Sequence, residues 1–355
     1  MLQVVSSAFP DIKKPSEDNN MRDRIRSYVL IIALVIALAP LEVFAETQED
    51  EPVFKDNQKI YVKLVEHVKD SVDLAASKIS NALKANGWEI AGTFYASVPE
   101  NCKYKTKVLI IHNEHYWQQI YGVSPYAKFV YPLKVNIYSD ETGTNISVTN
   151  PVALNRLISP ELEAVSAETL KTLAGLFHGA VKGNNIEKEE GTELDGNRIP
   201  GLGGGALEDN VIKIYTGKYK SDKVLETITK FIQYSLKRST KGYYLVYSID
   251  MRDKGIMFFG VSKQDLEKKA FTITGEKRVT NKNSCPGIDH ANAFPLEVVI
   301  DTTGKNIKEE MLRVMFKMKT YFGDTGEAAF VKHYMMPGSI EDEIVYTTYP
   351  DIYQQ

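Results

Sequence analysis

The chain has 355 residues, and its 43 lysines and arginines against 46 aspartates and glutamates leave a net charge of −3. This balance excludes the basic surface on which nucleic-acid-binding proteins and proteins that dock on anionic lipid depend. Hydrophobic residues make up 43% of the chain, which is enough for about two globular domains with separate cores.

The amino end has the pattern of an export signal. Basic residues precede an apolar run over 28–39, and small residues at Val43 and Ala45 stand just before Glu46. A basic stretch, a short apolar stretch and small residues at these spacings are typical of a cleaved signal peptide. We therefore predict a signal peptide over 1–45 and a mature protein that is periplasmic or otherwise extracytoplasmic.

An uncleaved membrane anchor over 28–45 is the alternative, since this stretch approaches the roughly 20 residues that a membrane span needs. Residues 1–20 are polar, and Met21 is an alternative start to Met1. Apart from this stretch, no segment is apolar enough to cross a bilayer. Contact with a membrane is therefore expected only through an uncleaved amino end.

Residues 46–56 are acidic and polar and are predicted to form a tether. The first predicted domain spans 57–182 and shows the apolar periodicities of strands and helices in turn. Its expected elements are a strand over 59–67, a helix over 71–86, strands over 88–95 and 105–111, a short helix over 113–121, a hairpin over 129–149 around Gly143, and a closing helix with Val165 and Val181 on one side.

Residues 183–209 are rich in glycine and acidic residues and lack apolar periodicity, so we predict an exposed linker there. A second domain is predicted over 210–350. Its expected elements are a strand over 211–219, a helix from Val224 to Leu236, strands over 243–249 and 255–260, a helix over 262–269, strands over 271–273 and 296–301, and a helix from Ile307.

One short pattern occurs in both predicted domains. Tyr131-Pro132-Leu133 opens a β-rich run that ends in an acidic, glycine-containing turn, and Phe294-Pro295-Leu296 opens another. Upstream of each, Lys59-Ile60-Tyr61 matches Lys213-Ile214-Tyr215. The spacing is too long for a solenoid repeat. It predicts two similar α+β domains, each a mainly antiparallel sheet packed with helices.

Residues 59–182 contain, in this order, a helix end over 83–90, a strand over 107–111, Tyr131-Pro132-Leu133 and Thr149-Asn150-Pro151. With this pattern the first domain resembles the family called domain of unknown function 302 (DUF302). A weaker resemblance in the second half rests on its own Pro-Leu strand. It implies tandem copies, the second divergent, with the family's fold and tendency to dimerise but no reaction.

The family pattern carries cysteines that this chain lacks. His112-Asn113-Glu114 stands at the place of the first cysteine, and Leu133 stands at the place of the second. The chain's own two cysteines, Cys102 and Cys285, fall in different predicted domains at positions that do not correspond. Separate thiols are favoured over an interdomain disulfide, which stays the alternative.

The densest set of possible metal ligands is His112, Glu114 and His115. Residues three apart on a helix share a face, so both imidazoles could reach one ion, with Glu114 orienting them and a remote ligand such as Cys102 assisting. The alternative is a polar loop that caps a short helix. A cluster of His333, Met335 and Met336 could similarly suit Cu(I), or else simply pack at the chain end.

The sequence shows no assembled catalytic residues and no cofactor signature, so we lean against an enzyme. The favoured function is a non-enzymatic binding or interaction module for a protein partner or a small apolar ligand, whose two domains pair with each other or form a homodimer. The alternative is a periplasmic metal or redox protein that holds copper, zinc or haem at His112, Glu114 and His115.

Overall fold

The computed structural model describes residues 57–199, 201, 203–218, 222–280 and 282–349. The predicted signal peptide (1–45) and tether (46–56) lie outside these residues. Across the described ranges, no helix has the length and apolar character to cross a membrane. All described residues belong to one unit that begins at Lys55.

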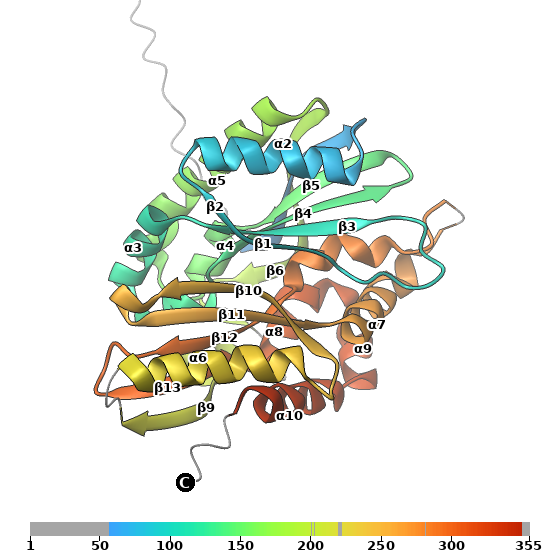
Figure 1. Cartoon of the computed structure of the whole chain (residues 1–355). Coiled ribbons are helices and arrows are strands. Elements are labelled where there is room, and N and C mark those ends of the chain that lie inside the picture. The colour runs from blue at the N-terminus through green and yellow to red at the C-terminus, as the bar shows by residue number, and fades with distance from the viewer. Residues whose placement is uncertain (1–56, 200, 202, 219–221, 281, 350–355) are drawn as a thin grey trace, which may run out of the picture. The chain divides into compact units, whose positions relative to one another are not determined.

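Five strands of the first half form an antiparallel sheet in the order β2-β3-β4-β5-β1 (Figure 1). The strands are β1 (Asn57–Val68), β2 (Glu89–Tyr95), β3 (Thr106–His112), β4 (Leu133–Asp140) and β5 (Gly143–Thr149). Helix α2 (Val72–Ala85) begins where the Ser71 side chain accepts a hydrogen bond from the Leu74 amide. Its apolar residues recur every three to four positions, so they form one stripe that packs on the sheet.

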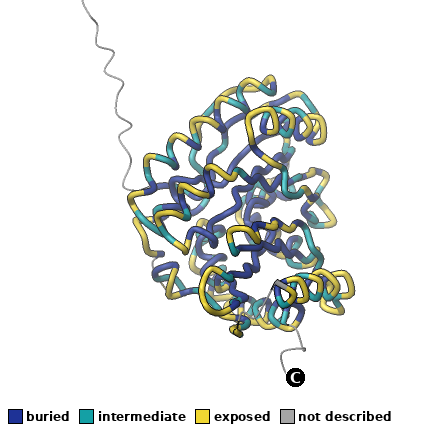
Figure 2. The backbone as a smooth tube through the Cα atoms, turned by 60° about the vertical axis from the view of Figure 1, so that its left-hand side comes forward, coloured by how far each residue is buried: buried dark blue, intermediate teal, exposed yellow. Residues whose placement is uncertain are grey.

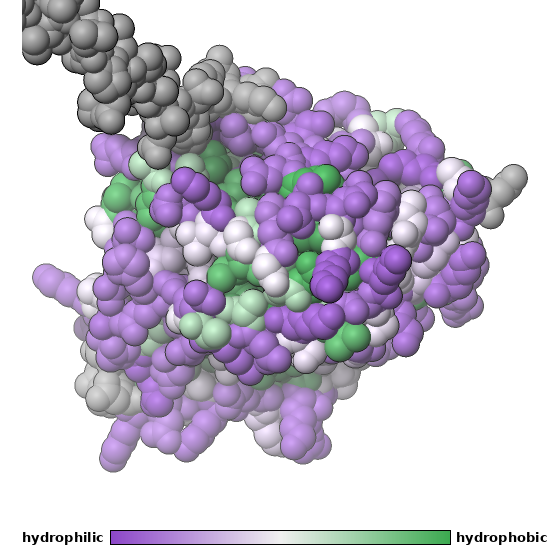
Figure 3. All heavy atoms as spheres, turned by 90° about the horizontal axis from the view of Figure 1, so that it is seen from above, coloured by the Kyte–Doolittle hydropathy of each residue, from purple (hydrophilic) through white to green (hydrophobic). Residues whose placement is uncertain are grey.

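The other helical segments of the first half follow the strands in chain order. They are α3 (Glu114–Val123), η1 (Pro125–Phe129), α4 (Pro151–Arg156), η2 (Pro160–Leu162) and α5 (Glu163–Ala180). Helices α2 and α5 cover the outer face of the sheet (Figure 1). Figure 3 looks onto this side of the molecule and shows a mainly hydrophilic surface with apolar side chains visible between the polar ones.

The predicted exposed linker over 183–209 is wrong at 184–195, because these residues form a strand. Strand β6 (Asn184–Asp195) pairs antiparallel with β1 and is followed by β7 (Arg198–Ile199) and β8 (Gly205–Ala206), which extend the first sheet to eight strands. Its side chains are mostly polar and half exposed, and Glu190 pairs with Lys63 at 2.9 Å. A strand held by main-chain bonds and surface ion pairs lacks the apolar alternation by which sequence reveals a strand.

The second half forms its own antiparallel sheet in the order β10-β11-β12-β13-β9. Its strands are β9 (Val211–Lys218), β10 (Tyr243–Met251), β11 (Ile256–Lys263), β12 (Leu296–Asp301) and β13 (Asn306–Leu312). Its helical segments are η3 (Glu208–Asn210), α6 (Asp222–Lys237), η4 (Arg252–Lys254), α7 (Gln264–Gly275), η5 (Glu276–Arg278), η6 (Pro286–Ala293), α8 (Val314–Phe322), η7 (Gly323–Thr325), α9 (Glu327–Lys332) and α10 (Met336–Thr348). The five shared strands thus have the same order in both sheets, and the α+β fold class is confirmed.

Two predictions in the second half are wrong. The segment 271–273 belongs to helix α7, and residues 306–312 form strand β13 instead of the start of a helix. Ile307 and Met311 are four residues apart, which suits a helix. They also alternate with their neighbours, and pairing with β12 and β9 decides for the strand.

Strand pairing shows which positions correspond in the two halves. Leu133 of β4 pairs with Ile111 of β3, and Leu296 of β12 pairs with Val261 of β11. Because the two Pro-Leu motifs correspond, residue 261 occupies the place of residue 111. Helices α3 and α7 each begin three residues further on.

The match predicted upstream of the two Pro-Leu motifs does not follow this correspondence. Val62 pairs with Val148, and Ile212 pairs with Met311 at the corresponding place in the second hairpin. Lys213 therefore corresponds to Lys63 and not to Lys59. The predicted match of Lys59-Ile60-Tyr61 with Lys213-Ile214-Tyr215 is wrong by four residues.

Each sheet has an outer face under its own helices and an inner face turned towards the other half. In β11, Met257, Phe259 and Val261 pack with residues of α6 and α10, whereas Ile256 and Phe258 join a cluster shared with the first half. Side chains alternate between the faces of a strand, so each strand serves both layers. Figure 2 shows buried segments in the interior and exposed helices outside them.

A disulfide joins Cys102 to Cys285 across 183 residues of sequence, so our preference for separate thiols was wrong. Each cysteine lies on a segment that is longer than its counterpart. Cys102 lies between β2 and β3, where eleven positions separate Tyr95 from Thr106 but only five separate Met251 from Ile256. Cys285 lies between α7 and η6.

We expect the disulfide to stabilise the pairing of the halves, because a bridge over so long a loop removes much chain entropy from the unfolded state. Replacing both Cys102 and Cys285 by serine should lower the free energy of unfolding by about 4 kcal/mol. Urea unfolding followed by far-ultraviolet circular dichroism measures this loss. An unchanged urea midpoint in the serine variant, compared with the oxidised protein, would contradict the expectation.

Candidate functional site

The three side chains predicted to bind a metal lie apart. His112 is the last residue of β3 and is buried, and its Nδ1 hydrogen-bonds to the Tyr131 hydroxyl. Burial lowers the pKa of His112, against the opposing charges of Glu89 and Glu114. His115 is exposed on the first turn of α3. Asn113 caps α3 between them, which breaks the helical spacing that the prediction assumed.

The remaining ligands of that prediction are also engaged elsewhere. Glu114 accepts a hydrogen bond from Gln118 at 3.1 Å and pairs with Lys254 at 3.5 Å. Cys102, the proposed remote ligand, is in the disulfide. Within the described ranges, no three histidine, cysteine, aspartate or glutamate side chains are grouped as metal ligands would be. The geometry thus favours the polar loop that caps α3.

An apolar cavity of about 40 Å³ lies in the second half, among helices α7, α8, α9 and α10. Side chains from all four helices and from the start of β12 line it, and almost none of its surface is polar. Residues that line it include Leu266, Ala270, Phe294, Tyr321, Phe330 and Met336. An apolar hollow with a few polar groups at its edge is the usual form of a small-molecule site.

Comparison of the two halves explains why the cavity is found in the second half. Leu266 and Ala270 of α7 occupy the places of Tyr116 and Ile120 of α3. Tyr116 and Ile120 are buried in the first half, where Tyr116 packs beside Tyr131. Smaller side chains at the same two positions of α7 leave space that the first half fills.

Helix α9 forms one wall of the cavity and is held by Lys319 of α8, whose ammonium pairs with Glu327 at 3.0 Å and lies over the Phe330 ring. It has six residues and follows Gly326, whose φ of 90° lies in a region that favours glycine. Its inner face contributes Ala329 and Phe330 to the cavity. On its outer face Val331 is 74% exposed. A helix this short depends on packing because it has little stability of its own.

An open groove of about 540 Å³ runs along the other side of the α9–α10 junction. It shares Leu266, His333, Met336 and Ile340 with the cavity, so only these side chains separate the two spaces. Met335 is 80% exposed at the rim. The predicted soft-metal cluster of His333, Met335 and Met336 is thus divided between a cavity wall and the surface.

Lys317 of α8 brings a charge to the inner wall of the cavity. Its ammonium pairs with Glu297 of β12, which also pairs with Lys134 of β4 at 2.6 Å. Burial favours the neutral carboxyl, but the two lysines outweigh it and lower the pKa of Glu297. Burial lowers the pKa of Lys134 to about 8. Because the ammonium of Lys317 is held by Glu297, its hydrocarbon stem is the part left for the wall.

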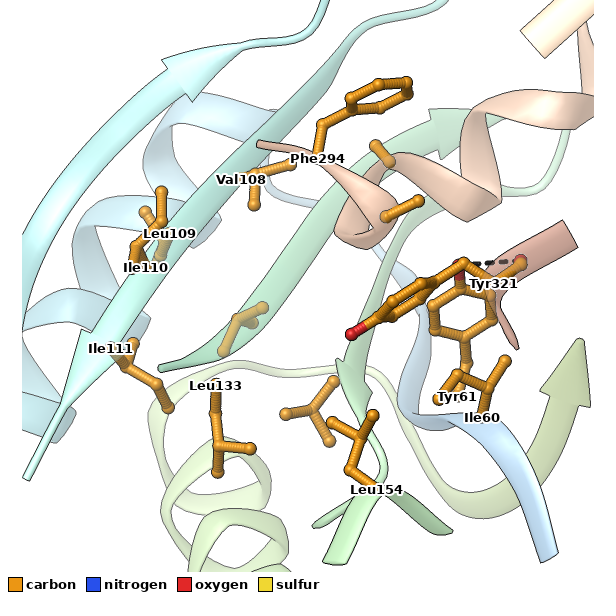
Figure 4. Close-up of a cluster of buried hydrophobic side chains, with 14 of the residues drawn as sticks. Ile60, Tyr61, Val108, Leu109, Ile110, Ile111, Leu133, Leu154, Phe294 and Tyr321 are labelled. Atoms are coloured by element: carbon orange, nitrogen blue, oxygen red, sulfur yellow. Dashed lines mark hydrogen bonds between the residues drawn. The ribbon is translucent and has the colours of Figure 1, made fainter. Parts of the chain in front are cut away.

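A second buried charge network surrounds His290 of η6. Its Nδ1 lies 2.6 Å from Asp289 and its Nε2 lies 2.9 Å from Asp324, while Arg278 pairs with Asp289 at 2.8 Å. Burial disfavours the charged imidazole, but the two aspartates raise the pKa of His290 to about 9. The Tyr61 ring packs edge-on against His290, and its hydroxyl donates to the Tyr321 carbonyl at 3.0 Å (Figure 4).

Both nitrogens of His290 are occupied and the ring is 1% exposed. The imidazole of His290 therefore ties η6 to η7. Neither of its nitrogens is left to bind a substrate. Our sequence analysis did not single out this histidine or the cavity. The adjacent Asp289-His290 pair was a visible signal, but Asp324 comes from a distant segment. The cavity depends on four helices that converge only in the folded chain.

The raised pKa of His290 makes the stability depend on pH. A folded-state pKa of about 9 against an unfolded value of 6.5 means that the stabilisation is complete below pH 6.5 and is lost as the pH rises through 9. The difference corresponds to about 3 kcal/mol. We expect the urea midpoint of the native protein to fall relative to that of His290→Gln over this interval.

His115→Gln is the matched control, because His115 is exposed. This variant should keep the pH dependence of the native protein. A His290→Gln profile parallel to that of the native protein between pH 6 and 10 would contradict the assignment, whatever the absolute loss of stability.

Comparison with known proteins identifies the first domain. Residues 64–179 match the family model described as "Domain of unknown function DUF302". A crystal structure of the uncharacterized conserved protein DUF302 from Bacillus stearothermophilus is 17% identical, covers 34% of this chain and 98% of its own, and has a TM-score of 0.30. Among curated proteins, none matches this chain. The likeness to the DUF302 family is thus shown for residues 64–179.

Proposed function

We propose that the protein is an exported binding module that takes a small apolar ligand into the cavity beneath α9. The observation that carries this proposal is the apolar wall formed by α7, α8, α9 and α10, which borders a groove of ligand size. Among the polar groups that line it, Lys317 pairs with Glu297, and Thr274 and Thr325 donate to main-chain carbonyls. The proposal is therefore binding without catalysis.

The cavity must widen to hold a ligand. A space of about 40 Å³ suits a water-sized molecule, whereas a cavity of about 150 Å³ is known to hold benzene. Displacement of α9 would join the cavity to the groove of about 540 Å³ by moving Phe330, His333 and Met336. Burial and the charges of Lys269 and Lys332 lower the pKa of His333, so its neutral ring can border an apolar ligand.

Exposed side chains on α9 and on the turn after it support such a movement. Val331 lies on α9, Tyr334 and Met335 lie between α9 and α10, and each has half or more of its surface exposed. Exposed apolar side chains gathered on one short segment often mark a binding surface. Here they would form part of the ligand's route into the second half.

We also propose that residues 210–350 are a divergent second copy of the DUF302 domain. The same strand order, the corresponding Pro-Leu strands and the matching starts of α3 and α7 support this. On this view the two copies have taken different roles. The first keeps a filled core at Tyr116 and Ile120, and the second opens that place for a ligand.

The ligand proposal is tested with N-phenyl-1-naphthylamine, an uncharged dye that fluoresces when it leaves water. We expect saturable binding to the full chain and competition by medium-length fatty alcohols. Ala270→Ile restores the bulk found in the first half, and Ala329→Leu fills the same space from α9, so each should weaken binding at least tenfold, with roughly 1.4 kcal/mol for each factor of ten.

Ala328→Leu is the control, since Ala328 is on the exposed side of the same helix. It should leave the dissociation constant unchanged. Equal affinity of all three variants, or binding that does not saturate, would place the dye elsewhere and remove the support for this function. Circular dichroism confirms that each variant is folded.

Export is supported by two independent features. The amino end has the signal pattern, although it lies outside the described residues, and the Cys102–Cys285 disulfide suits an oxidising compartment. We expect the protein isolated from its native cell to begin at Glu46 and to reside outside the cytoplasm. Amino-terminal sequencing checks this, and a cytoplasmic protein that retains residues 28–45 would contradict it.

A further inference from the structure

The two halves meet through residues that occupy corresponding positions. Lys134 and Glu297 each follow the leucine of a Pro-Leu motif, and each lies on the inner face of its sheet. Their side chains pair with each other at 2.6 Å and are almost completely buried. The same position is thus basic in one half and acidic in the other, at a point where the halves touch.

At a second pair of corresponding positions, the two halves carry side chains of complementary size. Gly92 of β2 pairs with Ile110, and Tyr247 of β10 pairs with Gly260, so the strand registers place Gly92 and Tyr247 at the same position. The two residues face each other across the halves. A Cβ atom added to Gly92 would lie 2.6 Å from the Cβ of Tyr247. An absent side chain in one half therefore meets a large one in the other.

These contacts indicate that a local twofold axis passes between the sheets. In a twofold pair, every contact occurs twice with exchanged partners, and only residues beside the axis meet their own counterparts. The exchange is seen in the elements at the flanks. Segment η1 contacts β12, where Lys128 pairs with Asp301, and its counterpart η6 contacts β4, where Asn136 donates to the Ile288 carbonyl at 3.0 Å.

We propose that the inner face of each half is an interaction surface that accepts the other half and rejects a second copy of itself. Two first halves would bring Lys134 against Lys134 and leave empty space between two copies of Gly92. Two second halves would bring Glu297 against Glu297 and Tyr247 against Tyr247. Like charges buried together and overlapping side chains each disfavour such a pair.

A further ion pair between the halves, whose counterpart positions are uncharged, also favours pairing of the two dissimilar halves. Lys128 also pairs with Glu310 at 2.8 Å, and the positions that correspond to Lys128 and Glu310 hold Ala291 and Ser147, which carry no charge. The partner that fits either half is therefore the dissimilar half of this chain. The inference concerns the pairing surface alone and does not depend on the ligand proposed above.

Charge reversal in the full chain tests the central pair. All variants carry Lys317→Leu, because Lys317 also holds Glu297 and would blur the result. Lys134→Glu and Glu297→Lys should each lower the urea midpoint by about 1 M. The double variant restores opposite charges and should recover at least half of the summed loss. Recovery of none of it, with the two effects simply additive, would overturn the proposal.

Lys230→Glu is the matched control for charge reversal. Lys230 pairs with Glu226 on the exposed surface of α6, where both side chains are largely in water. The same reversal there should leave the midpoint unchanged. If the reversal at Lys134 costs no more than this control, the buried pair does not set the choice of partner.

The choice of partner is measured directly on folded protein that is cut afterwards. A protease recognition sequence is inserted between Gly196 and Asn197, which form an exposed turn. The folded chain is cut, the disulfide is reduced, and natural and isotope-labelled samples are mixed in urea sufficient for labels to exchange. Native mass spectrometry should then show exchanged pairs of one first and one second half. Pairs of two first halves or two second halves in comparable amounts would overturn the proposal.

Discussion

The carboxylate of Glu297, buried between Lys134 and Lys317, is the interaction on which the rest of the structure depends. It stands where the two sheets face each other and where α8 reaches the cavity. Removing these charges from water is costly, and the attraction of Glu297 for the two lysines offsets the cost. A buried ion group of this kind makes a unique arrangement more favourable than a slightly shifted one. The sheets, helix α8 and the cavity wall therefore keep their relative positions together.

The same residues belong both to the interface between the two halves and to the wall of the cavity. Lys317 contributes its ammonium to the interface and its stem to the cavity, at a position that Leu154 occupies in the first half. A charged group at that place would be unfavourable beside an apolar cavity without its acidic partner from β12. The space at Ala270 and the charge at Lys317 are compatible only because Glu297 stands between the halves.

Sequence reasoning predicted what depends on local pattern and missed what depends on distant partners. The repeat around Pro132 and Pro295 predicted the fold class. By the same repeat, the hairpin around Gly143 implied a second hairpin in the other half. The helical spacing of Ile307 and Met311 led us to predict a helix there instead. Strand β6 was missed because its stability comes from β1 and not from its own apolar residues. The metal prediction at His112 and His115 failed because one helix cap at Asn113 separates them. The cavity has no sequence pattern at all, since four helices supply its walls.

The long separation between the two cysteines also has a consequence in time. Cys102 leaves the ribosome, or a translocation channel, 183 residues before Cys285 does. During that interval the first half can form its sheet, but its inner face, with Lys134 and the unfilled space at Gly92, has no covering. The nascent chain thus carries an unmatched thiol and an uncovered sheet face until the second half has been made. A thiol-protecting chaperone would have its most important work on this chain within that interval.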